Sequence, residues 1–296
     1  MDSTELQKWR QAGKLGSETL AYAKSIVKLD MPLLELAEKI EEFVESKKAK
    51  FAFPVNLSKD EIAAHFSPQY GSEEKAEGLL KIDLGVSLDG YISDLSCTVD
   101  LTKEKKYTKL IEASQKALNE AIKLIKPGIE IRKIGKAIQE AISSYGFAPI
   151  VNLSGHELQQ WKLHAGLTIP NFDNNSDVKL KEGQVLAIEP FATTGQGMIQ
   201  DGKPSGIYNF LEKHSARDPL AKEILAFIEQ EYHELPFSSR WIVKKFGTRA
   251  LFSLRALEQA QALHQFKQLV EKTKMPVSQA EATVLVTKEG CEVLAK

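Results

Sequence analysis

The sequence predicts an α+β fold in which an antiparallel sheet is backed by helices. Over residues 79–101, apolar and polar side chains alternate on both sides of Asp89-Gly90. A period of two is typical of half-buried strands, and Asp-Gly is a strong hairpin signal. Elsewhere, apolar residues recur at helical spacing, and the segments follow the order helices, hairpin, helices, strand, helical block, hairpin. Strands and helices segregated in this way indicate α+β.

The chain begins with two predicted helices, over 4–28 and 33–47, with Pro32 just before the second. Proline is favoured at a helix start, which supports that boundary. A mixed segment follows over 51–68 and leads into the hairpin.

The hairpin is the most informative stretch because it brings two carboxylates together. Asp83 precedes the turn and Asp94 follows it, and the parity of the alternation reverses between them. Antiparallel pairing therefore places both on one face, opposite or diagonal to each other. Carboxylates that close repel unless a proton or cation lies between them, and oxygen ligands suit a divalent metal. The alternative is a surface hairpin with solvated aspartates.

Two further helices are predicted over 106–125 and 131–145, separated by Lys126-Pro127-Gly128. Pro-Gly is a typical stop signal. The chain then becomes irregular and polar, and His156 follows Ser154-Gly155 in an expected loop. It is a candidate ligand, or an ordinary surface histidine.

Within the strand predicted over 184–191, Glu189 follows the apolar run 185–188 and precedes Pro190. We therefore expect it to be buried, and a buried carboxylate needs a partner. Residues 209–272 are predicted to be almost wholly helical, and a second hairpin closes the chain over 282–294. Glu281 begins that last strand pair, where a solvated strand end is an equally good interpretation. Three histidines of the helical block are interpreted as surface or packing residues: His214, His233 and His264.

Composition sets the outer bounds. The 296 residues are 43% apolar and 27% charged, as in ordinary soluble proteins, and the net charge of -1 gives no argument for nucleic acid or membrane partners. No apolar run approaches the ~20 residues of a membrane span. The polar, acidic N-terminus is unlike a signal peptide, so we expect a cytoplasmic protein. Cys97 and Cys291 are expected as reduced thiols rather than a disulfide.

The candidate ligands together form a recognisable set of four carboxylates and one imidazole. They are Asp83, Asp94, His156, Glu189 and Glu281. Two divalent cations would balance the four negative charges. Ions about 3.5–4 Å apart lower the pKa of a bridging water and polarise a carbonyl, which is the chemistry of a dinuclear hydrolase.

The chain closely resembles the type 2 methionine aminopeptidases of peptidase family M24, particularly their short archaeal form, from about residue 5 to its end. Six motifs, specific only in combination, carry the resemblance: Phe53-Pro54-Val55-Asn56-Leu57-Ser58, Ala63-Ala64-His65, Lys81-Ile82-Asp83, Asn152-Leu153-Ser154-Gly155-His156, Lys162-Leu163-His164-Ala165-Gly166 and Ala187-Ile188-Glu189-Pro190-Phe191-Ala192. The resemblance implies the pita-bread (creatinase/aminopeptidase) fold. It also implies one catalytic domain over 1–296 with a helical insertion at about 209–272.

The resemblance further implies metal-dependent removal of the initiator methionine from nascent proteins, with preference for a small second residue. Asp94 and Glu281 would bridge two metals, Asp83 would bind one, and His156 and Glu189 would complete the other. The ions would be Co, Mn, Fe or Zn, among which the sequence does not choose.

Four residues would act on the substrate by the same resemblance. Glu189 would shuttle the proton, and His164 would stabilise the oxyanion or the scissile amide. His65 would contact the peptide just beyond the scissile bond and would be accessible and nucleophilic. Phe53 would line the hydrophobic pocket for the methionine side chain, or it is an ordinary core aromatic. For His65 and His164 the alternative is a pair of polar loop histidines. The partners would be nascent N-termini near the ribosome, and the protein a monomer.

The sequence departs from the family at its last ligand. Where members usually have Glu-His-Thr after an apolar residue, this chain has Ala280-Glu281-Ala282-Thr283. The missing histidine is not a ligand, so the site should survive, but hydrogen-bonding support of Glu281 comes into question.

Two other functions are weighed. One is a non-catalytic ribosome- or RNA-binding protein on the same fold; such relatives typically lose ligands, whereas all five are present here. The other is a relative cleaving before proline, which is disfavoured because the motifs around His65 and His156 match the methionine branch.

Overall fold

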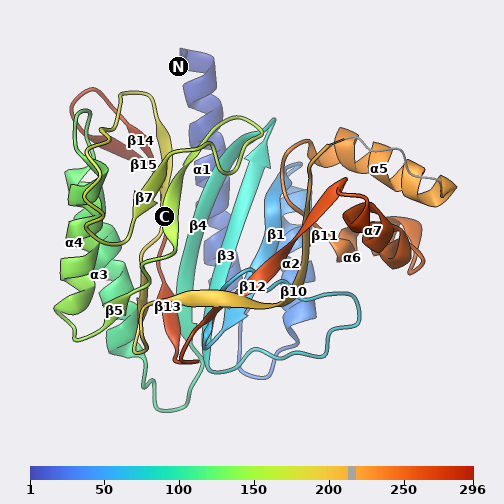
Figure 1. Cartoon of the computed structure of the whole chain (residues 1–296), viewed down its shortest axis with the longest axis horizontal. Helices are drawn as coiled ribbons and strands as arrows, with labels where there is room; N and C mark the ends of the chain where they lie inside the picture. The colour runs from blue at the N-terminus through green and yellow to red at the C-terminus, as the bar shows by residue number, and fades with distance from the viewer. Residues whose placement is uncertain (213–217) are drawn as a thin grey trace.

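The computed structural model describes residues 1–212 and 218–296, which form helices and antiparallel strands (Figure 1). The helices are α1 (Ser3–Ile26), α2 (Leu33–Ser46), α3 (Thr108–Leu124), α4 (Ile131–Ser143), α5 (Pro219–Tyr232), α6 (Ser239–Phe246) and α7 (Ala250–Gln259). The strands are β1 (Lys50–Lys59), β2 (Ile62–Ala64), β3 (Leu79–Leu88), β4 (Tyr91–Asp100), β5 (Ala148–Pro149), β6 (Ser154–Leu158), β7 (Thr168–Pro170), β8 (Val185–Ile188), β9 (Phe191–Thr193), β10 (Ile199–Phe210), β11 (Phe237–Ser238), β12 (Leu263–Glu271), β13 (Val277–Gln279), β14 (Ala282–Val286) and β15 (Cys291–Ala295).

Two sheets, each backed by a pair of helices, form the body of the molecule. The first has the order β1-β3-β4, and α1 and α2 cover its apolar face, with Leu36 and Ile40 packed into the same core as Ile82 and Leu84. The second has the order β15-β14-β8-β6-β7 and packs on α3 and α4. The predicted α+β class is confirmed.

The first four helices and the β3–β4 hairpin fall where the sequence places them. The hairpin pairs from Leu79↔Asp100 to Leu88↔Tyr91 without a break in register. Helix α1 lies directly on this hairpin because Gly16 leaves room for a side chain of β4: a Cβ there would stand 2.3 Å from Ser93 Oγ. Cys97 and Cys291 are both free and half-buried, as expected.

The late block departs from the prediction of an almost wholly helical 209–272. Helices α5, α6 and α7 cover only part of it, and β12 pairs with β10 and β2. Within β12, Leu263, Phe266 and Leu269 recur every third residue and imitate helical spacing. The segment forms a strand instead because its backbone N–H and C=O groups form hydrogen bonds with those of β10. His233 and His264 are exposed, as predicted; His214 lies outside the described residues.

The late helices have a core of their own, to which Tyr208, Ile224, Phe237 and Leu254 contribute. Figure 1 shows α5, α6 and α7 together beside the edge of the body nearest β1. None of the helices in the described ranges has the length and apolarity that a bilayer span needs.

A buried ion pair fixes this late block to the body. Arg240 of α6 donates from Nη1 and Nη2 to the two carboxylate oxygens of Glu41 on α2, at 2.6 and 2.7 Å, and the Trp241 indole donates to the same carboxylate at 2.9 Å. Both charged side chains are at most 10% exposed. The pair closes the contact between α2 and α6 without an unpaired charge.

We expect Glu41→Gln to lower the free energy of unfolding by about 3–5 kcal/mol, because a buried guanidinium loses its counter-charge. Urea unfolding of both proteins measures the change. Glu35→Gln is the matched control, since Glu35 forms an exposed pair with Lys39 and should have no measurable effect. Equal effects of the two substitutions would contradict the assignment.

Candidate metal centre and substrate pocket

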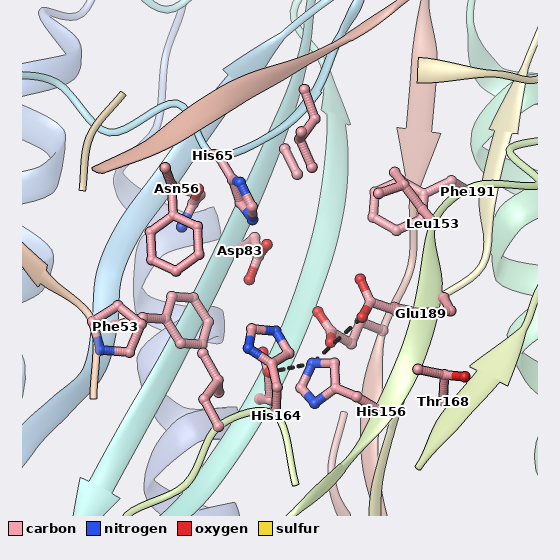
Figure 2. Close-up of a pocket in the computed structure, with 18 of the residues that line it drawn as sticks. Phe53, Asn56, His65, Asp83, Leu153, His156, His164, Thr168, Glu189 and Phe191 are labelled. Carbon is pink, nitrogen blue, oxygen red and sulfur yellow. Dashed lines mark ion pairs between the residues drawn. The ribbon is translucent and has the colours of Figure 1, made fainter. Parts of the chain in front are cut away.

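A cavity of about 450 Å³ lies between the two sheets, and all eight residues singled out from the sequence line it. Figure 2 shows Asp83, His156, Glu189 and His164 gathered around one space, with Phe53 and His65 on its other side. The group joins segments more than 200 residues apart in the chain, from Phe53 to Glu281.

The hairpin contributes Asp83 and Asp94, as its parity predicts. Asp83 pairs with Ser96 in the ladder, and Asp94 with Gly85, so the two aspartates are diagonal neighbours on one face. Asp94 is only 3% exposed, which excludes the interpretation of a solvated surface hairpin.

His156 lies in a strand, and the prediction of a loop around it is wrong. Strand β6 carries it beside Ala187 of β8, the strand that ends next to Glu189. The glycine that suggested a loop has another use, because a Cβ at Gly155 would lie 2.3 Å from the Ala187 carbonyl oxygen. Gly155 thus lets two strands approach closely and places the imidazole in the cavity.

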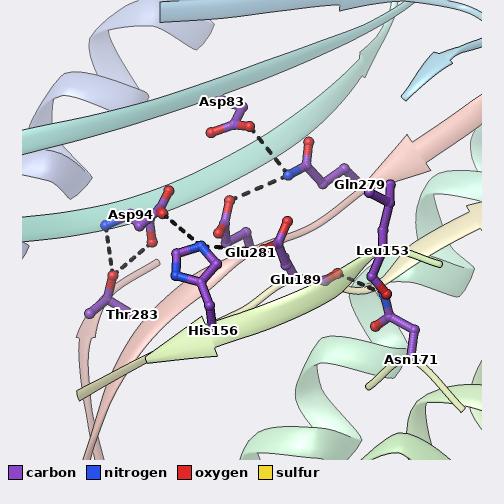
Figure 3. A network of polar contacts seen from close by, with 9 residues as sticks. All are labelled: Asp83, Asp94, Leu153, His156, Asn171, Glu189, Gln279, Glu281 and Thr283. Carbon is purple, nitrogen blue, oxygen red and sulfur yellow. Dashed lines mark hydrogen bonds and ion pairs between the residues drawn. The ribbon is translucent and has the colours of Figure 1, made fainter. Parts of the chain in front are cut away.

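The five candidate ligands converge closely (Figure 3). His156 Nε2 lies 3.5 Å from Asp94 Oδ2 and 3.5 Å from Glu189 Oε1. One ligand atom each from Asp94, His156 and Glu281 fall within 4.8 Å of one another, as around a single ion. Glu281 is 2% exposed, so it is not a solvated strand end.

Threonine hydroxyls hold the ligand-bearing strands together. Thr283 Oγ1 accepts from the Asp94 amide N–H and donates to the Asp94 carbonyl, both at 2.7 Å. Thr98 Oγ1 makes the same pair of bonds with the backbone of Gln279, at 2.8 and 2.7 Å. These two pairs of hydrogen bonds fix β4 against β13 and β14, and so fix Asp94 relative to Glu281.

Gln279 is a site residue that the sequence analysis did not single out. Its Nε2 lies 3.5 Å from Asp83 Oδ2 and 3.4 Å from Glu281 Oε2, and the side chain is 1% exposed. Ala282, where the resemblance leads us to expect a histidine, is buried opposite Ile188. The amide of Gln279 is the side-chain group that supports Glu281 here. Its two-residue spacing from Glu281 was the available signal.

The carboxylates cannot all be charged without a counter-ion. Burial raises the pKa of Asp83 to about 7, and burial followed by repulsion from Asp83 raises that of Asp94 well above its usual range. The pKa values of Glu189 and Glu281 are raised for the same two reasons, burial first and neighbouring carboxylates second. Burial lowers the pKa of His156 to about 3, so its imidazole is neutral and free to act as a ligand.

This donor set fits divalent metal. Asp83 Oδ1 is buried and has no hydrogen-bond partner in the described part of the chain. Clustered carboxylates with one neutral imidazole suit Mn, Fe, Co or Zn. Positive charge between them would relieve the repulsion that, after burial, raises the pKa values of Asp94, Glu189 and Glu281.

The remaining residues line the way to the cluster. The rings of His164 and His156 are 4.4 Å apart, and desolvation lowers the pKa of His164. Desolvation also lowers the pKa of His65 to about 4, and its ring meets Phe266 at 5.4 Å. Phe53 is 7% exposed and lies over Gly85, so it belongs both to the core and to the pocket wall.

Comparison with known proteins gives a consistent picture. Residues 7–234 match the model of metallopeptidase family M24. The methionine aminopeptidase of Methanocaldococcus jannaschii is 40% identical over 298 residues, covering 100% of both chains. That of Pyrococcus abyssi is 43% identical over 290 residues, covering 97% of this chain and 98% of its own.

Among solved structures, a thermophilic Arx1 superposes with a TM-score of 0.86 at 15% identity, over 100% of this chain and 91% of its own. Methionine aminopeptidase from Rickettsia prowazekii superposes with a TM-score of 0.71 at 21% identity, covering 100% of this chain and 98% of its own. The prolidase from Pyrococcus furiosus superposes with a TM-score of 0.62 at 18% identity, covering 100% of this chain and 64% of its own. At such identities the likeness shows the fold alone, which is the expected pita-bread fold.

Proposed function

Since the chain belongs to metallopeptidase family M24 and, within it, to the methionine aminopeptidases, we propose that it removes the initiator methionine from nascent polypeptides with two divalent ions. The observation that carries the proposal is the convergence of four carboxylates and a neutral imidazole in one cavity beside His164 and His65. The whole chain would act as one catalytic domain, and the α5–α7 block as its insertion.

Asp83, Asp94, His156, Glu189 and Glu281 would hold the ions, whose four positive charges match four carboxylates. Bound there, the ions would supply Lewis acidity that polarises the scissile carbonyl and lowers the pKa of water. We propose two ions per chain, drawn from Co, Mn, Fe and Zn.

Glu189 would take the proton of the attacking water and deliver it to the leaving amine. Burial among carboxylates makes its protonated form easy to reach, as a shuttle requires. His164 would donate a hydrogen bond to the developing oxyanion, which a neutral imidazole can do without reorganisation. Its lowered pKa keeps it neutral at neutral pH.

Substrate selection would follow from the cavity walls. Phe53 and Leu163 offer apolar surface for the methionine side chain, while His65 and Phe266 would face the second residue and favour a small one. Phe266 also lines a second cavity of about 470 Å³. The rest of the bound polypeptide would extend through this second cavity to the surface. We propose nascent chains near the ribosome as substrates of a monomeric enzyme.

A peptide panel tests the proposal. Free methionine should be released rapidly from Met-Ala-Ser and Met-Gly-Ser and slowly from Met-Leu-Ser, with no further residues removed. A Met-Pro rate far above the Met-Gly-peptide rate would instead favour an enzyme specific for proline. If protein supplied with Mn or Co binds no metal and releases methionine from none of the peptides, a binding protein would be favoured.

Gln279→Leu should weaken metal binding about 10- to 100-fold, because the amide that supports Asp83 and Glu281 is lost while the side-chain volume is kept. Metal titration followed by methionine release measures the change. Gln265→Leu is the matched control, since Gln265 bonds Tyr208 on β10 away from the carboxylates. Unchanged affinity in Gln279→Leu would contradict the role given to the amide.

A further inference from the structure

The segment that carries His164 begins with a strained turn. Gln159 and Lys162 exchange two backbone hydrogen bonds of 3.0 Å and enclose Gln160 and Trp161. Trp161 has φ 62°, a conformation that turns normally give to glycine or asparagine. A bulky side chain there is held against its backbone preference by its surroundings.

Two other segments hold that turn in place. The backbone N–H of Trp161 donates to the Gly90 carbonyl at 2.9 Å, and Gln160 Nε2 donates to the Asp89 carbonyl at 2.8 Å. Both acceptors lie at the tip of the β3–β4 hairpin. The indole lies so close to Gly90 that a Cβ there would stand 2.5 Å from the ring. The turn is thereby tied to the hairpin that carries Asp83 and Asp94.

On its other side the indole meets the late helical block. The rings of Trp161 and His233 are 4.2 Å apart. His233 caps the end of α5 and is itself strained, with φ 54° and ψ −120°. Two non-glycine residues with unfavourable backbone conformations therefore contact each other where the late helical block meets the body. Leu235 and Pro236 follow His233 closely in the chain, and Pro236 lines the cavity.

Trp161 stands three residues before His164, and its turn fixes where the following segment starts. The segment is tied again at Ala165, whose N–H bonds Glu157 O at 2.8 Å. Between these two anchors lie Leu163 and His164, both of which line the cavity.

We infer that Trp161 is a positioning residue for His164, and that His233 is the means by which the late helical block contributes to that positioning. The inference rests on the proposed function of His164 but concerns residues outside the cavity. It explains why strain is kept at both positions: the contact of the two rings sets the segment in one arrangement.

Trp161→Gly is the decisive variant because glycine suits φ 62°, so the turn can form while the indole is lost. We expect kcat for methionine release from Met-Ala-Ser to fall about 10- to 100-fold, with KM changed less, since small misplacements of a reacting group are costly. His233→Gly should lower kcat in the same direction by about 3- to 10-fold. Asn175→Gly, at φ 59° in an exposed loop, is the matched control and should leave kcat unchanged.

A double-mutant cycle separates positioning from mere stability. In a His164→Ala background, Trp161→Gly should cost less than about twofold, because nothing remains to be positioned. Equal losses in the two backgrounds would overturn the inference. So would an unchanged His164 ring resonance in the NMR spectrum of Trp161→Gly, a readout that holds even for protein without activity. Absence of methionine release by the wild-type enzyme would instead count against the proposed function.

Discussion

Glu189→Gln should lower kcat for methionine release by about 10²–10⁴-fold at saturating metal. The substitution keeps the size of the side chain but removes its ability to accept the proton of water and pass it on, and proton transfer of this kind is worth that much. The cavity shape and the contacts of Phe53 are untouched, so KM should change much less.

Metal content must be measured in the same protein, because Glu189 also belongs to the candidate ligand set. Full metal content with lost turnover would assign the loss to proton transfer. Turnover within about fivefold of wild type would contradict the role of Glu189.

Asp94→Asn should reduce both metal content and activity. Asp94 lies among His156, Glu281 and Asp83, so removing its charge affects the whole cluster. We expect elemental analysis to fall from about two equivalents to one or none, and kcat/KM to fall by about 10³-fold or more. Asp100→Asn is a control within the same strand, since Asp100 caps a turn at the far end of the hairpin. This variant should keep the metal content of the wild-type protein.

The fold around the ligands could be predicted because local patterns and long-range packing agree there. The parity of the β3–β4 hairpin is enough to bring Asp83 and Asp94 together, and burial at the end of β8 is enough to implicate Glu189. Which other strands approach the hairpin could not be derived from periodicity, and the family resemblance supplied it.

The failures also have physical reasons. His156 was expected in a loop because Gly155 is a turn signal, yet the glycine serves a close approach of β6 to β8. Strand β12 was missed because its apolar residues imitate helical spacing, and only pairing with β10 decides its conformation. Gln279 has no charge or motif of its own, and its role depends on Asp83, a carboxylate that the distant strand β3 contributes, as well as on the nearby Glu281.

The contact between Trp161 and His233 could not be predicted from any sequence pattern. It depends on a positive φ at two unrelated positions and on the packing of the late block against the body. Tertiary structure alone brings these two residues together.

Release of free methionine from Met-Ala-Ser, followed in protein stripped with chelator and then reloaded with Mn or Co, tests the central claim most directly. The account predicts no release from stripped protein, recovery as about two equivalents bind, and no recovery in Asp94→Ala. Release that is independent of metal, or full recovery in Asp94→Ala, would contradict it.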